Sequence, residues 1–214
     1  MRMRSLVLLF ATCFGCTSQP EVRLVPGVDV SDIPSTVAIY PILTTESKTQ
    51  EVGPVIVQFD DSGSSVDLDR VYIQPPSETK LLVTAQSQQM TDLLHAELSY
   101  QGFKVKELPI EVPDEWGGDA DGNPTFYLSV GLLQHLKENF GFEAIILGNV
   151  YFASNRRGDV GVRAAYLRLV EIGTLDVLCH VSIDGGDFSM GLVESAESVA
   201  AKLARMANLP EPQE

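Results

Sequence analysis

The sequence predicts an α/β fold in which a mixed β-sheet is flanked by helices, in the order β-(hairpin)-α-β-α-β-β-β-α. Apolar runs rich in β-branched residues alternate with segments whose apolar residues recur at helical spacing. Alternation of this kind favours helices packed on a sheet over a helical bundle or a β-sandwich. The 199 residues from Cys16 onward are enough for one sizeable core and too few for two full domains, so we expect a single domain, which we place at 35–209.

The N-terminal half predicts a strand, an inserted hairpin and a helix. The strand covers residues 37–43, and Pro41 suits a strand end or edge. Residues 44–80 are polar and rich in Gly, Ser and Pro, and the apolar runs 55–59 and 66–73 within them predict an inserted β-hairpin. A helix over 82–101 follows, with Gly102 as its C-terminal stop. Its apolar positions are Ala85, Met90, Leu93, Leu94 and Leu98.

The C-terminal half predicts a half-buried strand, a loop and then an α-β-β-β-α series. The strand is 103–108. The loop is 109–124, in which Pro113 and Pro124 flank the acidic, glycine-rich residues 114–123. The next helix includes Phe126, Val130, Leu133 and Leu136 and ends near Gly141. Three strands follow at 144–153, 160–172 and 177–183, with turns at 155–159 and 173–174. The last helix carries Leu192, Ala196, Val199, Ala200, Leu203 and Ala207.

The first residues have the pattern of a signal peptide that ends at a cysteine. Arg2 and Arg4 form a basic start, residues 6–14 are mostly apolar, and Gly15 is small enough to precede a cleavage site. The run is shorter than the roughly 20 apolar residues that a membrane-spanning helix needs. Because Phe14, Gly15 and Cys16 resemble a bacterial lipobox, we expect residues 1–15 to be removed and Cys16 to be lipidated, with acyl chains such as palmitate.

The alternative for this leader is an ordinary secretory signal that is cut elsewhere, since Cys13 stands where a lipobox usually has Leu. Under the lipoprotein hypothesis, residues 16–34 form a lipidated N-terminus and tether, and 210–214 form a short C-terminal tail. Thr17, in place of Asp, follows the cysteine. By resemblance to Gram-negative lipoproteins, this favours lipid anchoring at the periplasmic face of the outer membrane.

Charge and cysteine content exclude several functions. The formal net charge is −14, and loss of the two leader arginines makes it more negative. A chain this acidic repels phosphate backbones, so we expect no nucleic-acid partner. Only Cys16 and Cys179 remain after the leader. Two thiols exclude a disulfide framework and a multi-cysteine zinc site.

Four segments, read in order, resemble the curli-secretion lipoprotein superfamily: 37–42, 93–105, 140–150 and 167–178. They share its series of an apolar strand, a helix ending in a Gly-Phe turn, a strand ending in Gly, and a β-hairpin. Relatives in that superfamily include a polysaccharide-export lipoprotein and activators of peptidoglycan synthases, and the N-terminal domain of the Tol–Pal translocation protein is similar. The resemblance covers residues 35–207 and implies a non-enzymatic envelope lipoprotein.

Candidate chemistry is sparse, and we assign no catalytic, cofactor-binding or metal-binding residue. Asp119, Asp121 and Asn123 have the spacing of the first three ligands of a calcium loop, but Gly122 falls at position 4 where the loop needs glycine at position 6, and position 12 is Val130 instead of Glu. A solvated turn explains them better. The three histidines, His95, His135 and His180, show no paired-ligand spacing, so each is expected to be an ordinary surface or half-buried side chain.

Three residues are candidates for contact with a partner. Trp116 lies among acids and glycines in the loop 109–124, where it either contacts a partner or covers the sheet. Arg156 and Arg157 lie between two predicted strands, where they either bind an anionic partner or form a solvated hairpin tip. We place the contact on the inserted loops, because binding residues concentrate on surface loops of a rigid scaffold.

Two classes of function remain. The first is an envelope lipoprotein that is not an enzyme and that acts by self-assembly or by docking to other envelope proteins. The second is a periplasmic domain that binds a small ligand or a metal in the crevice at the carboxyl edge of the sheet, near Gly148 and the loop 109–124.

Overall fold

The computed structural model describes residues 19–47, 56–59, 70–74, 79–108, 126–154, 159–184, 190–210 and 212. Within these ranges the chain forms a mixed sheet with helices on both faces, as the sequence predicts. The helices are α1 (Ala85–Tyr100), α2 (Val130–Phe140), α3 (Leu192–Met206) and the short 3-10 helix η1 (Val30–Asp32).

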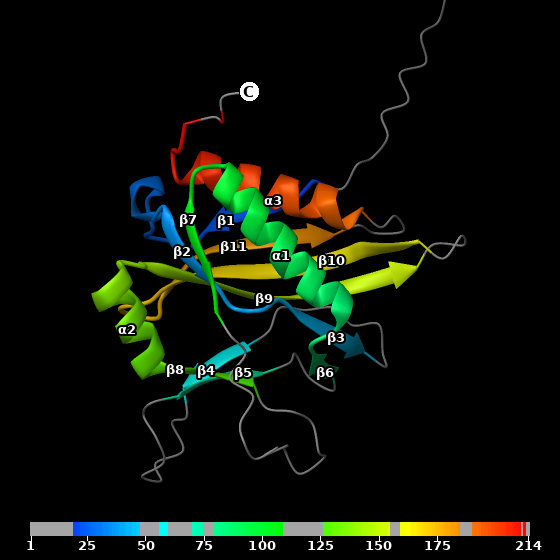
Figure 1. The fold of residues 1–214 in the computed structure, drawn as a ribbon, viewed down its shortest axis with the longest axis horizontal. Helices are drawn as coiled ribbons and strands as arrows, with labels where there is room; N and C mark the ends of the chain where they lie inside the picture. Colours follow the sequence, from blue (N-terminus) through cyan, green and yellow to red (C-terminus); the bar gives the residue numbers. More distant parts are fainter. Residues whose placement is uncertain are drawn as a thin grey trace, which may run out of the picture.

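The main sheet has the strand order β1-β11-β10-β9-β2-β7, and β3 lies beside β9 and pairs with β6 (Figure 1). The strand β9 runs parallel to β2 and β3 and antiparallel to β10, which makes the sheet mixed. These strands are β1 (Glu21–Leu24), β2 (Thr36–Ile39), β3 (Leu43–Ser47), β6 (Thr79–Leu82), β7 (Lys104–Glu107), β9 (Ala144–Ser154), β10 (Val160–Glu171) and β11 (Val177–Asp184).

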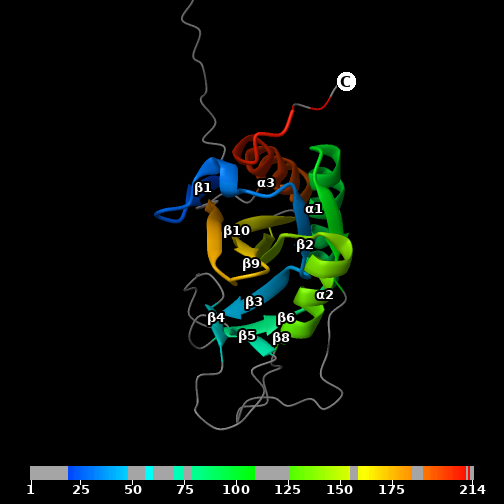
Figure 2. The ribbon, with the colours of Figure 1, turned by 90° about the vertical axis from the view of Figure 1, so that its left-hand side faces the viewer.

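A second, smaller sheet has the order β4-β5-β8, formed by β4 (Ile56–Phe59), β5 (Arg70–Gln74) and β8 (Phe126–Ser129). Figures 1 and 2 place it at the end of the molecule away from α3. The antiparallel pair β4–β5 confirms the inserted hairpin. The segment 44–80 is nevertheless more than a loop, because β3 and β6 at its two ends extend the main sheet.

The two faces of the main sheet carry separate apolar cores. The helices α1 and α3 lie side by side on one face, where Leu94 and Val199 are fully buried with Val37 and Ile146. The helix α2 packs on the other face, where Leu133 contributes to a second cluster with Ala38, Tyr40 and Ile145. Alternate residues of β2 and β9 therefore face opposite cores, as expected for strands that are buried on both sides.

Local sequence determines where the helices begin and end. Thr84 caps α1: its hydroxyl accepts a hydrogen bond from the Ser87 amide at 3.2 Å, and the Thr84 amide donates to the Ser87 hydroxyl at 2.8 Å. Gly102 and Gly141 follow α1 and α2 with φ of 95° and 66°, where glycine is favoured. Both predicted helix ends are therefore confirmed.

Several sequence-based boundaries were wrong. The strand expected over 37–43 is divided, since β2 ends at Ile39 and β3 begins at Leu43. Phe126 was expected in a helix but lies in β8, which pairs with β5. The helix begins only at Val130, because the Ser129 hydroxyl accepts a hydrogen bond from the Leu132 amide at 3.3 Å and so caps α2. The expected tether 16–34 contains β1, which forms an edge of the main sheet by pairing with β11, so ordered structure begins well before residue 35.

Candidate functional site

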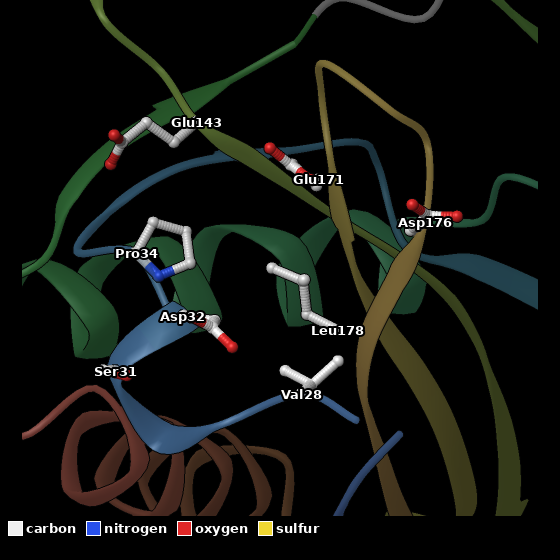
Figure 3. A pocket seen from close by; sticks show the side chains of 8 residues that line it. All are labelled: Val28, Ser31, Asp32, Pro34, Glu143, Glu171, Asp176 and Leu178. Atoms are coloured by element: carbon white, nitrogen blue, oxygen red, sulfur yellow. The ribbon is translucent and has the colours of Figure 1, made fainter. Parts of the chain in front are cut away.

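A pocket of about 450 Å³ lies at the amino ends of the parallel strands β2 and β9, beside the turn between β10 and β11 (Figure 3). Glu143 directly precedes β9, and Ser31 and Asp32 of η1 line the pocket as well. Four acids and a few apolar side chains line it: Val28, Ser31, Asp32, Pro34, Glu143, Glu171, Asp176 and Leu178.

Three of these carboxylates accept a hydrogen bond from a nearby backbone amide or side-chain hydroxyl. Glu143 accepts a hydrogen bond from the Thr36 hydroxyl at 3.0 Å, and Glu171 accepts one from the Thr174 hydroxyl at 2.8 Å. Asp32 accepts one from its neighbouring Asp29 amide at 2.7 Å. Figure 3 shows the four carboxylates pointing in different directions, and the described residues contain no group of three or more His, Cys, Asp or Glu placed to hold a metal ion.

This pocket lies at the opposite end of the sheet from the crevice that the sequence predicted. Gly148 lies inside β9, opposite Leu167 of β10, and a Cβ at this position would be 2.8 Å from the Leu167 Cα. Gly148 therefore fits the close approach of β9 and β10. The loop 109–124, the other part of that prediction, lies outside the described residues.

A second candidate is the part of the sheet face formed by β1, β11 and β10, on the side away from α1 and α3. Side chains on this part alternate with the buried residues Val181 and Leu167 of the first core. Cross-strand pairs arrange them in rows. The first row is Arg23, His180 and Arg168, the second is Glu21, Ser182 and Tyr166, and the third contains Asp184 and Ala164.

The first row, Arg23–His180–Arg168, is a line of three basic side chains on an acidic protein; we call it the basic row. Arg23 and His180 are exposed and Arg168 is half-buried. Arg23 donates a hydrogen bond to Glu21 at 2.8 Å in an exposed ion pair. The Arg168 Nε is buried and has no hydrogen-bond partner among the described residues.

The electrostatics of the basic row follow from burial and from like charge. Burial lowers the pKa of Arg168, because a half-buried guanidinium loses hydration. Burial and, second, the Arg168 charge lower the pKa of His180. In the second row, burial raises the pKa of Tyr166, and Asp184 and Tyr151 add to this effect. Arg168 and a protonated His180 therefore carry charge of the same sign as direct cross-strand neighbours, and the acid Glu21 is paired with Arg23 at the other end of the row.

The site residues that the sequence predicted lie mostly outside the described ranges. Cys16, Trp116, Arg156 and Arg157 all do so, as do Asp119, Asp121 and Asn123 of the calcium-like spacing, so these remain predictions. The structure describes all three histidines. The His135 ring lies against Phe140 at a centroid distance of 5.4 Å, and His95 is half-buried on α1. His180 alone belongs to the basic row.

Sequence analysis did not identify Arg168 or Tyr166 as candidate residues. Their only signal was that Tyr166 and Arg168 interrupt an apolar strand at alternate positions, which places them on one face. That His180 and Arg23 lie on the same face depends on the strand register and required the structure.

Comparison with known proteins finds weak structural similarity, with TM-scores below 0.5. No family model matches the chain, and no curated protein matches it. A point variant of the PelC dodecamer from Paraburkholderia phytofirmans has a TM-score of 0.44 at 12% identity, covering 91% of this chain and 100% of that chain. The PelC dodecamer from the same organism in another crystal form has a TM-score of 0.42 at 12% identity, covering 90% and 99%. Likeness at this level carries no functional inference. Among the described residues, no helix is both long and apolar enough to cross a membrane.

Proposed function

We propose that this chain is a bacterial envelope lipoprotein, anchored by Cys16 at the periplasmic face of the outer membrane. In this proposal it is not an enzyme and acts by docking to other envelope proteins or to copies of itself. The observation that carries the proposal is the apolar leader that ends in Phe14-Gly15-Cys16. The resemblance to the curli-secretion lipoprotein superfamily supports the same class and remains a proposal.

The position of β1 fits an anchor at Cys16. Glu21, the first residue of β1, stands five positions after Cys16, and β1 is paired along its length with β11. Five residues span at most about 17 Å when fully extended. A lipid on Cys16 would therefore hold the β1 edge of the sheet close to the membrane surface.

The anchor is tested by fractionating cells that express the chain with its leader. Cys16→Ser should move the protein from the membrane fraction to the soluble fraction and abolish labelling with palmitate. Cys179→Ser is the matched control, because Cys179 is buried in the core and should leave both unchanged if the fold is kept. Membrane association and palmitate labelling that persist in Cys16→Ser would move the assignment to Cys13 or overturn it.

Docking is tested on the proposed contact residues Trp116, Arg156 and Arg157. Trp116→Ala should weaken co-purification of a partner from detergent-solubilised membranes without lowering the melting temperature. The double change Arg156→Gln, Arg157→Gln should act in the same direction if these arginines bind an anionic partner. An unchanged set of co-purified proteins in both variants would contradict contact through these residues.

A further inference from the structure

We propose that the basic row, Arg23–His180–Arg168, binds the phosphate of an anionic phospholipid in the membrane that holds the anchor. The proposal rests on the lipid anchor proposed above. It adds a second, non-covalent contact between the folded domain and the bilayer, on a face of the sheet that we did not single out from the sequence.

The geometry of the row suits an anion. His180 lies directly opposite Arg23 on one side and Arg168 on the other, so the three side chains are cross-strand neighbours on one face of the sheet. Directly opposed residues in antiparallel strands have Cβ atoms about 5 Å apart. A protonated His180 and Arg168 at that spacing repel each other, and a phosphate between them would stabilise the protonated imidazole by turning this repulsion into attraction. A guanidinium also presents several donors that match phosphate oxygens.

The pairing of the hydrogen-bond donors in the basic row also favours an anion. The Arg168 Nε has no hydrogen-bond partner among the described residues, which is unfavourable for a donor that has lost its water, while the side chain as a whole is only half-buried. Glu21 pairs with Arg23 and is exposed, so a phosphate has to compete with it only for Arg23. Arg168 and His180 therefore form the core of the site, and Arg23 forms its open rim.

The length of chain between the anchor and the row favours a lipid over other anions. Arg23 stands seven positions after Cys16, a distance of at most about 25 Å when the chain is extended. Headgroups would then lie within reach of the row, at the high effective concentration that tethering produces. The net charge of −14 opposes approach to an anionic surface, but charges more than about 10 Å apart are largely screened at 0.1 M salt.

The test uses the natural lipidated protein in nanodiscs, with histidine isotopically labelled for NMR. One set of discs contains phosphatidylcholine alone, and the other contains added phosphatidylglycerol. We expect phosphatidylglycerol to shift the pKa of His180 upward, while His95 and His135 report any general effect of the anionic surface. Arg168→Gln should abolish most of the difference at His180, and Arg163→Gln, an exposed change elsewhere on β10, should leave it.

Three results overturn the proposal. An equal pKa of His180 in both kinds of disc does so, and so does a shift that is the same for all three histidines. The third is a shift at His180 that appears with added polyglutamate in neutral discs but not with phosphatidylglycerol, which would assign the row to an acidic protein segment. A protein that fails to associate even with neutral discs would instead contradict the anchor at Cys16, so the two failures are distinguishable.

Discussion

Arg168 of β10 lies directly opposite His180 of β11, on the face of the main sheet away from α1 and α3. Two basic side chains in this position on a chain of net charge −14 are a departure from the overall character of the protein. Burial of the guanidinium makes their mutual repulsion stronger than it would be in water.

We expect the stability of the fold to depend on His180 at mildly acidic pH. Burial and Arg168 lower the pKa of His180 in the folded state, so the unfolded chain binds more protons below the ordinary histidine pKa of about 6.5. The His180 contribution therefore destabilises the fold as pH falls through that range. Melting temperatures at about pH 5 and about pH 7.5 should differ less in His180→Gln than in the natural protein. An unchanged difference would contradict the assignment.

Leu94→Asp should unfold the domain. Leu94 is fully buried between α1 and the sheet, and an unpaired carboxylate there costs several kcal/mol against a total stability of about 5–15 kcal/mol. Ala96→Asp introduces the same group at an exposed position of α1 and should change the melting temperature little. Circular dichroism on thermal melting measures both, and equal melting of the two variants would mean that the buried face of α1 is misassigned.

Gly148→Ala should destabilise the protein strongly. A Cβ at this position would meet the Tyr166 carbonyl oxygen and lie 2.8 Å from the Leu167 Cα, and both are backbone atoms that cannot move alone. Gly131→Ala is the matched control on α2, where the nearest atom is the Ser129 hydroxyl at 3.6 Å. This second change should stabilise by up to about 1 kcal/mol, since alanine is the better helix former. Chemical denaturation compares them, and similar losses in both would contradict the close contact of β9 and β10.

Cys179 should resist alkylation in the folded protein. Its side chain is fully buried, and burial raises the pKa of the thiol to about 11, so little thiolate is present at neutral pH. Iodoacetamide followed by peptide mass spectrometry should modify Cys179 only after denaturant is added. Rapid modification of the folded chain at neutral pH would show that the β10–β11 region opens readily.

Helix ends that depend on local residues were predicted correctly from the sequence, and two features that depend on tertiary pairing were not. The helix ends at Gly102 and Gly141 were predicted because glycine with positive φ stops a helix. β1 was missed because Glu21–Leu24 is a short, half-polar segment whose support is tertiary: it pairs with β11, more than 150 residues later, and Val22 and Leu24 pack against the first core. Phe126 was misassigned because its spacing to Val130 fits a helix, and the competing pairing of β8 with β5 is tertiary.

The candidate sites also divide into one that depends on a local pattern and one that depends on strand pairing. The leader-like pattern that ends at Cys16 is local and can be recognised from the sequence alone, and the lipid anchor that it predicts stays a prediction. The basic row joins residues of three strands, and only the register brings Arg23, His180 and Arg168 together. A sequence pattern shows which residues alternate along one strand but not which strands lie side by side.

Mass spectrometry of the N-terminal peptide of the protein purified from its own membranes tests the central claim most directly. The account predicts a mature chain that begins at Cys16, with the added mass of acyl chains on that residue and no peptide from residues 1–15. A mature chain that begins at Thr17 or later, or an unmodified Cys16 within a longer chain, would contradict the lipid anchor and the membrane contact that depends on it.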